Sequence, residues 1–154
     1  MSKRIAILTG GGDCPGLNPA IRGVVLKAAK LGYECVGIQE GWKGMIDAAA
    51  KPMTIDDVKE IVGKGGTILG TSRTNPYKKE GGVLKVLETF KKLDLHALVA
   101  MGGEDTLGVA AKLFKEHKVN VIGVPKTMDN DLDATDYTFG FDTSATLAME
   151  AAER

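Results

Sequence analysis

Short apolar segments recur along the chain and alternate with segments that have the periodicity of amphipathic helices. Each apolar segment is bounded by glycine or polar residues and has the length of a strand that is buried on both faces of a parallel sheet. The segments lie at residues 5–8, 35–38, 97–101 and 121–124. The pattern predicts strands at these positions.

The segment after the first predicted strand has the clearest helical pattern. Asn18 followed by Pro19 is typical of an N-cap with proline at the first helical position, and apolar residues recur at helical spacing as far as Gly32. Thr54 predicts the cap of a shorter helix that ends near Val62. Further helical patterns occupy residues 82–93, 106–116 and 143–153.

The alternation of strands and helices predicts the fold class. It favours right-handed βαβ units and a mainly parallel sheet, so we expect an α/β fold, a Rossmann-like three-layer sandwich. The 154 residues fall within the roughly 100 to 200 residues of one domain. Trp42 falls in a predicted loop, where it either closes the edge of the core or contacts a ligand, and the core role is favoured.

Charge and cysteine content exclude several classes of protein. Twenty basic and twenty acidic side chains cancel, so no net field attracts the chain to nucleic acid or to an anionic membrane surface. The apolar stretches are much shorter than a membrane span, and no secretory signal is recognisable. Cys14 and Cys35 lack the spacing of a zinc site. We expect a cytoplasmic protein that binds neither nucleic acid nor membrane.

Candidate chemistry lies in the loops that follow predicted strands, because ligands of parallel α/β sheets bind outside the carboxyl ends of the strands. The first such loop contains Gly10, Gly11 and Gly12. Glycines let backbone N–H groups approach a phosphate, and the helix N-terminus adds a partial positive charge, although a tight turn would use the same residues. The loop has neither the GxxxxGK[ST] pattern of a P-loop nor the GxGxxG pattern of a dinucleotide fold.

The second loop runs from Gly102 to Thr106, where we expect the next helix to start. It contains adjacent carboxylates, Glu104 and Asp105. These side chains either stabilise the helix dipole or hold Mg²⁺, which prefers one or two carboxylates together with phosphates and water. The residues alone leave both interpretations open.

The third loop combines Lys126 and Thr127 with the carboxylates of Asp129 and Asp131. A solvated charge cluster is the ordinary interpretation. Phosphoryl transfer to a hydroxyl needs a base, a metal and a cation, and the second and third loops together offer candidates for all of these. Arg73 adds a guanidinium after a hydroxyl-rich turn, where it binds phosphate bidentately or forms a surface ion pair.

Taken in order, these segments resemble the phosphofructokinase family. The resemblance extends from residue 3 to the C-terminus and rests on residues 8–18, 65–73, 102–106, 125–131 and 136–143. It implies that Asp129 is the general base for the 1-hydroxyl of fructose 6-phosphate, that Thr127 lies beside the reacting oxygen and that Asp131 supports this substrate site. It also implies the rest of the site: Lys126 as a catalytic cation; Gly11, Gly12, Arg73, Gly103, Asp105 and Thr106 as donor-binding residues; and Glu104 and Asp105 as Mg²⁺ ligands.

The resemblance also bears on the phosphoryl donor. ATP-using members typically have Gly-Gly-Asp-Gly-Ser where this chain has Gly102 to Thr106, and Pro-Gly-Thr where it has Pro125 to Thr127. Asp105 would occupy the space of the α-phosphate of ATP and repel it, whereas Lys126 would neutralise the end of pyrophosphate. The resemblance therefore favours pyrophosphate, with ATP as the alternative donor.

The family's subunit is about twice as long as this chain. We therefore expect residues 1–154 to be the N-terminal, donor-binding half of a glycolytic enzyme that makes fructose 1,6-bisphosphate and is a homo-oligomer at full length. Most of the sugar-phosphate site would be absent and turnover by this half would be inefficient. The alternative from another class is a non-catalytic half-domain that binds phosphate and needs a partner. A lipid or NAD kinase is disfavoured by residues 125–131.

Overall fold

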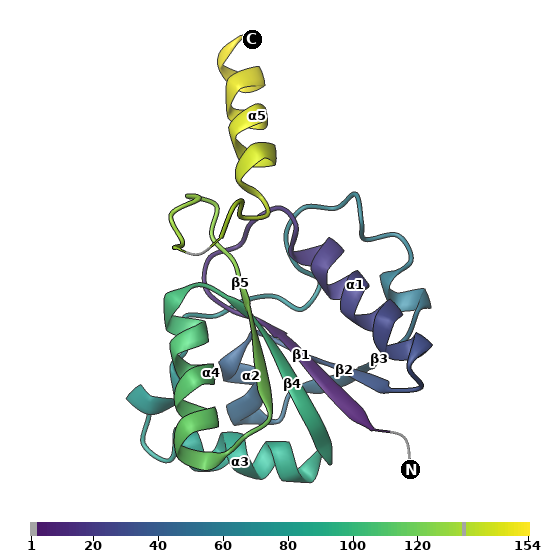
Figure 1. Cartoon of the computed structure of the whole chain (residues 1–154), viewed down its shortest axis with the longest axis vertical. Helices are drawn as coiled ribbons and strands as arrows, with labels where there is room; N and C mark the ends of the chain where they lie inside the picture. Colours follow the sequence, from purple (N-terminus) through teal and green to yellow (C-terminus); the bar gives the residue numbers. More distant parts are fainter. Residues whose placement is uncertain (1–2, 134) are drawn as a thin grey trace.

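The structure, a computed structural model, describes residues 3–133 and 135–154. Within these residues one five-stranded sheet has the strand order β3-β2-β1-β4-β5 (Figure 1). The strands are β1 (Arg4–Thr9), β2 (Glu34–Ile38), β3 (Ala50–Met53), β4 (Leu95–Gly102) and β5 (Val121–Pro125). All neighbours pair in parallel except β3, which is antiparallel to β2 at one edge. The predicted α/β fold is confirmed.

Helices cover both faces of this sheet and bury a separate apolar cluster on each. One face carries α1 (Leu17–Lys30) and the 3-10 helix η1 (Asp56–Val58), and the other carries α2 (Trp42–Asp47), α3 (Gly82–Lys92) and α4 (Glu104–His117). The 3-10 helix η2 (Pro76–Lys78) lies beside α3. Alternate side chains of β1 divide between the two clusters, because successive residues of a strand point to opposite faces.

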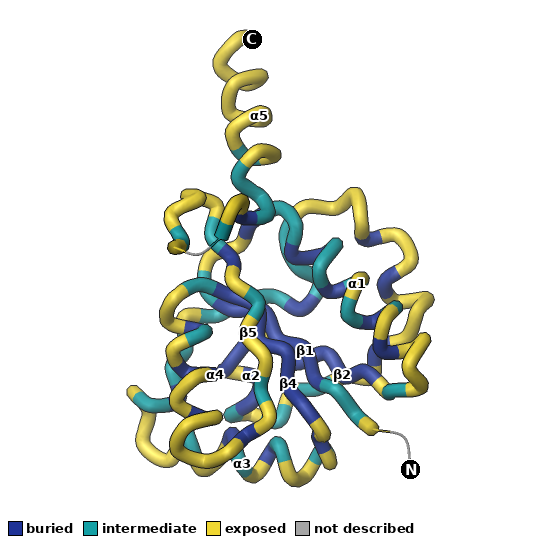
Figure 2. The backbone as a smooth tube through the Cα atoms, in the orientation of Figure 1, coloured by how far each residue is buried: buried dark blue, intermediate teal, exposed yellow. Residues whose placement is uncertain are grey.

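The last helix, α5 (Phe141–Ala152), differs from the others because none of its residues is buried. It extends away from the sheet and is exposed along most of its length, with partly buried residues only near its start (Figures 1 and 2). The helical pattern at residues 143–153 is confirmed. None of the helices in the described part of the chain has the length and apolarity that crossing a bilayer would require.

The strands predicted from the apolar segments are confirmed as β1, β2, β4 and β5, and the helix at residues 82–93 is confirmed as α3. The sequence reasoning missed β3, whose exposed Lys51 and Pro52 lack the buried apolar pattern of the other strands. Proline is tolerated there because β3 is an edge strand, where some N–H groups need no partner.

The predicted role of Asn18 as the cap of α1 is wrong. The N-cap is Gly16, with φ 99° and no side-chain cap. Asn18 is only 2% exposed, and its Nδ2 donates hydrogen bonds to the carbonyls of Lys64 (3.1 Å) and Gly65 (3.2 Å). Its Oδ1 accepts from the N–H of Ile68 at 2.8 Å. The side chain therefore fixes a distant loop instead of its own helix.

Two further local predictions are wrong. Trp42 begins α2 instead of lying in a loop, although its 2% exposure confirms the core role. Thr54 does not cap a helix that reaches Val62, because only the short η1 follows it. The backbone N–H and the hydroxyl of Thr54 both donate to Asp57 Oδ2 at 2.7 Å, so the carboxylate is the acceptor.

Candidate active site

The loops after β1, β4 and β5 meet at the carboxyl edge of the sheet, as the sequence predicts. Two backbone hydrogen bonds join their starting points: the N–H of Gly10 donates to the carbonyl of Met101 at 2.9 Å, and the N–H of Lys126 donates to the carbonyl of Gly102 at 3.0 Å. We name residues 10–16 the glycine loop and residues 125–131 the lysine loop. The parallel register of the strands thus brings both loops beside the N-terminus of α4.

The glycine loop packs tightly on the first turn of α4. A Cβ built on Gly10 would lie 2.5 Å from the hydroxyl oxygen of Thr106, and one on Gly102 would lie 2.6 Å from its Cβ. Thr106 is 4% exposed as a result. Gly11 has a φ of 81°, and its N–H donates a hydrogen bond to the carbonyl of Ser72 at 3.4 Å. The N–H of Gly12, in contrast, has no hydrogen bond among the described residues.

Lys126 is the most unusual side chain of the site. It is 6% exposed, and its Nζ donates to the carbonyl of Gly12 at 2.5 Å. A Cβ on Gly11 would lie 3.6 Å from the same nitrogen. None of the ion pairs in the described part of the chain includes Lys126. A buried ammonium without a carboxylate partner favours a bound anion.

The largest space at this edge is an open hollow of about 760 Å³, bordered by the glycine loop, the start of α4 and the lysine loop. It is strongly acidic apart from Lys126. The carboxylates that line it are Asp13, Glu104, Asp129, Asp131 and Asp133. Sequence reasoning had assigned no role to Asp13 or Asp133, although Asp13 directly follows the run of glycines.

The composition of the hollow fits a magnesium–phosphate complex. No group of three or more carboxylate, histidine or cysteine side chains in the described residues is close enough to hold a metal by itself. Mg²⁺ usually takes one or two carboxylates and completes its six ligands with phosphate oxygens and water. Carboxylates spread around a hollow with one buried ammonium match that requirement, because the metal would offset their repulsion of a phosphate.

The structure does not bring the two predicted metal ligands, Glu104 and Asp105, into one pocket. The helix α4 begins at Glu104, two residues earlier than predicted, so both carboxylates belong to its first turn. Glu104 borders the hollow. Asp105 instead borders a separate crevice of about 40 Å³, together with Gly11, Arg73 and Thr106. Arg73 therefore borders the same crevice as Asp105, whereas Asp129 borders the hollow.

The lysine loop is held in shape by the hydroxyl of Thr127. This hydroxyl donates to Asp131 Oδ1 at 2.9 Å and accepts from the N–H of Asp129 at 3.2 Å. Asp129 itself is exposed and borders the hollow. The predicted substrate residues are thus neighbours in one network, in which Asp131 orients Thr127 and Thr127 orients the backbone of Asp129.

The two cysteines, Cys14 and Cys35, are free thiols and both are buried. Burial raises the pKa of Cys14; Lys126 opposes this effect and Asp13 adds to it. Burial also raises the pKa of Cys35. Neither residue has the lowered pKa of a nucleophilic thiolate.

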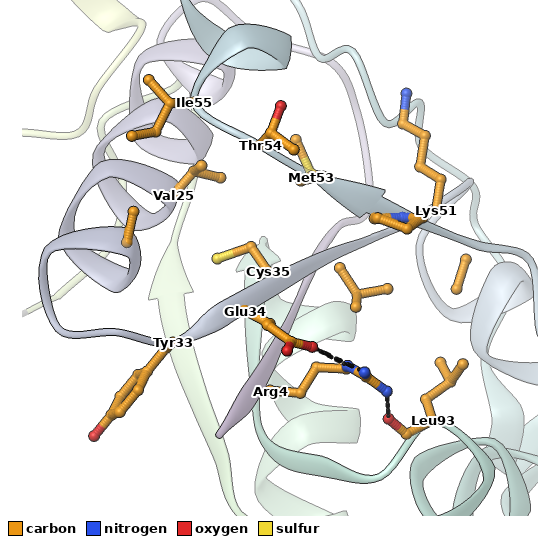
Figure 3. A pocket seen from close by; sticks show the side chains of 14 residues that line it. Arg4, Val25, Tyr33, Glu34, Cys35, Lys51, Met53, Thr54, Ile55 and Leu93 are labelled. Carbon is orange, nitrogen blue, oxygen red and sulfur yellow. Dashed lines mark hydrogen bonds and ion pairs between the residues drawn. The ribbon is translucent and has the colours of Figure 1, made fainter. Parts of the chain in front are cut away.

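A second sizeable cavity lies near the amino ends of β1 and β2, away from these loops (Figure 3). It measures about 420 Å³ and contains none of the predicted site residues. Its lining is mostly apolar, and Arg4 spans it by pairing with Glu34 at 2.8 Å and donating to the carbonyl of Leu93 at 2.7 Å. The candidate residues predicted from the sequence border the hollow and the crevice instead.

Known proteins are similar to this chain in sequence along its whole length. The family model described as phosphofructokinase matches residues 4–154. The chain is 57% identical over 155 aligned positions to a pyrophosphate–fructose 6-phosphate 1-phosphotransferase of Dictyoglomus thermophilum, covering 100% of this chain and 44% of the relative. It is 46% identical to an ATP-dependent 6-phosphofructokinase 1 of Thermus thermophilus, covering 99% of this chain and 47% of the relative.

Solved structures agree with the fold. The crystal structure of Pichia pastoris phosphofructokinase in the T-state superposes with a TM-score of 0.85 at 29% identity, covering 94% of this chain and 17% of that one. The chain thus spans less than half the length of each of the relatives named above.

Proposed function

Because the chain belongs to the phosphofructokinase family, we propose that it forms the donor side of an active site that transfers a phosphoryl group from pyrophosphate, with Mg²⁺, to the 1-hydroxyl of fructose 6-phosphate. The products would be fructose 1,6-bisphosphate and phosphate. The observation that carries the proposal is Lys126, a buried ammonium that faces the glycine loop and has no carboxylate partner among the described residues.

The donor assignment rests on Asp105, which borders the small crevice, and on Lys126, which borders the larger hollow. Asp105, Trp42 and Arg73 border a crevice of about 40 Å³, whereas pockets for drug-sized ligands measure about 300–1,000 Å³. A nucleoside has no room in the crevice as it stands. The hollow beside Lys126, at about 760 Å³, accommodates pyrophosphate and its metal. The relative from Dictyoglomus thermophilum, which is named for pyrophosphate, supports the same donor.

The lysine loop would supply the acceptor chemistry. Asp129 would take the proton of the 1-hydroxyl while that oxygen forms a bond to the transferred phosphorus, and the bond from phosphorus to the departing phosphate breaks. Thr127 and Asp131 would keep the loop in shape through the hydrogen bonds described above. Lys126 and the N–H of Gly12 would bind the phosphate oxygens as negative charge moves to the leaving group.

Magnesium would be held at the edge of the hollow by Glu104 and by other carboxylates that line it, such as Asp13. When bound, the metal would supply positive charge that offsets the negative charge of the phosphates and of the surrounding carboxylates. For the whole enzyme, we propose that a longer chain supplies the rest of the sugar-phosphate site and assembles into a homo-oligomer. The 154 residues alone would bind the donor with little turnover.

The proposal is tested by isothermal titration of the chain with pyrophosphate and with ATP, each in the presence of Mg²⁺. Lys126→Met should weaken pyrophosphate binding by about tenfold or more, since hydrogen bonds to charged groups contribute about 1.5–3 kcal/mol. Asp105→Gly should allow ATP to bind by removing the like charge and opening the crevice. Lys115→Met, on the exposed end of α4, is the matched control and should leave both affinities unchanged.

Either of two outcomes would contradict the assignment. Tight ATP binding by the unaltered chain would make ATP the donor, as in the Thermus relative. Equal pyrophosphate affinity in the chain and in Lys126→Met would remove the main support for the site.

A further inference from the structure

Residues 138–140 directly precede α5 and contact both the glycine loop and the lysine loop. They lie within the motif at residues 136–143 that contributes to the family resemblance but that the proposed chemistry leaves without a role. Thr138 is 5% exposed, whereas residues 135–137 and 139–141 on either side of it are exposed or only partly buried. The polar groups of a buried residue need hydrogen-bond partners, so the contacts of Thr138 show what this segment is attached to.

The first contact is with the lysine loop. Both the N–H and the hydroxyl of Thr138 donate to Asn130 Oδ1, at 3.0 and 3.3 Å. Asn130 follows Asp129 directly and has a φ of 54°, in the left-handed region. The two hydrogen bonds hold Asn130 in this turn and thereby fix the backbone beside Asp129.

The second contact is with the glycine loop, and it is so close that the glycines there leave no room for a side chain. A Cβ on Gly16 would lie 2.7 Å from the ring of Phe139, and one on Gly140 would lie 2.4 Å from the carbonyl of Pro15. Cys14 Sγ also donates a long hydrogen bond of 3.8 Å to the carbonyl of Phe139. Phe139 packs against the buried cluster that includes the start of α1.

Residues 138–140 thus form a second tie between the two loops, in addition to the bond from Lys126 to Gly12. With two ties, the loops cannot separate or rotate as freely as with one. A diphosphate that touches both loops needs them at a fixed spacing, whereas a single phosphate near Lys126 does not. Preorganised spacing raises affinity because the ligand does not have to order the loops itself.

We propose that Thr138 and Phe139 are positioning residues that set the spacing between the glycine loop and the lysine loop, so that one diphosphate is held by both. This inference rests on the proposed use of pyrophosphate. It predicts that disturbing the tie weakens the binding of the diphosphate selectively, while a purely structural role for the segment would weaken every ligand or only the fold.

The test compares pyrophosphate with inorganic phosphate, each with Mg²⁺, by isothermal titration of the chain. Thr138→Val removes the hydroxyl while keeping the shape and the backbone N–H. It should weaken pyrophosphate binding about three- to tenfold, as expected for one lost hydrogen bond, and leave phosphate binding within about twofold. Thr138→Ser should restore pyrophosphate binding. Thr89→Val, at a threonine on α3 that is 4% exposed, should change neither affinity.

A second variant keeps the inference falsifiable if Thr138→Val fails to fold, which far-UV circular dichroism reports. Phe139→Leu should show the same selective loss. Unchanged pyrophosphate affinity, or an equal loss for both ligands, would overturn the positioning role and leave the proposed function standing. Failure of the unaltered chain to bind pyrophosphate would overturn both.

Discussion

The burial of Lys126 depends on its surroundings in the fold and not on the residue type alone. Its ammonium is buried against the carbonyl of Gly12, and burying a charge without an opposite charge costs free energy that a bound anion can offset. The sequence predicts the lysine in the correct loop. It does not predict the burial, because that depends on a loop more than a hundred positions earlier in the chain folding over the side chain.

The contact between Gly10 and Thr106 gives a prediction at the same scale. Gly10→Ala would place a Cβ 2.5 Å from Thr106 Oγ1, and overpacking of this kind costs about 1–3 kcal/mol. In a Thr106→Ala background the nearest remaining atom is the Cβ at 3.4 Å, so the added cost should largely disappear. Urea unfolding of the single and double variants measures both values.

Gly108 on α4 is the control for this cycle. A Cβ there would meet nothing within 4 Å, so Gly108→Ala should stabilise the chain by about 0.5–1 kcal/mol through helix propensity. An equal cost of Gly10→Ala in both backgrounds would show that Thr106 is not the cause.

The buried thiols give a prediction that depends on pH. Because burial raises the pKa of Cys14 and of Cys35, the folded chain keeps both protons where the unfolded chain would release them. Their contribution to stability is therefore present below the ordinary thiol pKa and is lost as the pH rises above it. The urea concentration at the midpoint of unfolding should therefore decrease as the pH is raised from 8 to 10. At pH 8 both thiols should react with a disulfide reagent only after the chain has unfolded. Rapid labelling of a thiol in the native chain would contradict this account.

At the scale of elements, sequence patterns located the long helices and the buried strands but misplaced several boundaries. Asn18 followed by Pro19 has the local signature of a helix start, yet Asn18 is held by residues 64–68. A cap prediction considers only neighbours along the chain and cannot anticipate such a distant partner. The strand β3 was missed for a related reason, since its pairing with β2 and not its composition makes it a strand.

The role of Asn18 can be separated experimentally from helix capping. Asn18→Ala should cost about 1–3 kcal/mol, because buried carbonyl and N–H partners lose their hydrogen bonds. Hydrogen exchange should show faster exchange of the Ile68 amide, which donates to Asn18 Oδ1, with little change in the first turn of α1. Asn120→Ala, which removes one exposed bond to the carbonyl of His96, is the control. Faster exchange confined to the first turn of α1 would restore the capping role.

At the scale of the whole molecule, topology explains most of what the sequence predicted about the site. Parallel strands end at one edge, so loops after β1, β4 and β5 had to converge there. Topology did not predict that Glu104 and Asp105 border different spaces, because that follows from where the first turn of α4 begins. Nor did it reveal the tie at residues 138–140, which depends on close packing at Gly16 and Gly140.

Two elements of the fold, α5 and the edge strand β5, expose large apolar side chains. α5 has no buried residue, and Leu147 and Met149 on it are 57% and 56% exposed. Ile122 on the edge strand β5 is 58% exposed. The relatives from Dictyoglomus and Thermus are more than twice as long as the aligned region. Donor binding is therefore the part of the proposed reaction that the described site should show by itself.

The most direct test of donor binding is the thermal stability of the chain with Mg²⁺ and either pyrophosphate or ATP. A ligand at a hundred times its Kd stabilises the folded state by about 2.7 kcal/mol. We expect a higher Tm with pyrophosphate and no change with ATP, because in the proposed site Lys126 would bind the small donor and Asp105 borders a crevice of only about 40 Å³. A higher Tm with ATP and none with pyrophosphate would contradict the donor assignment while leaving the family intact.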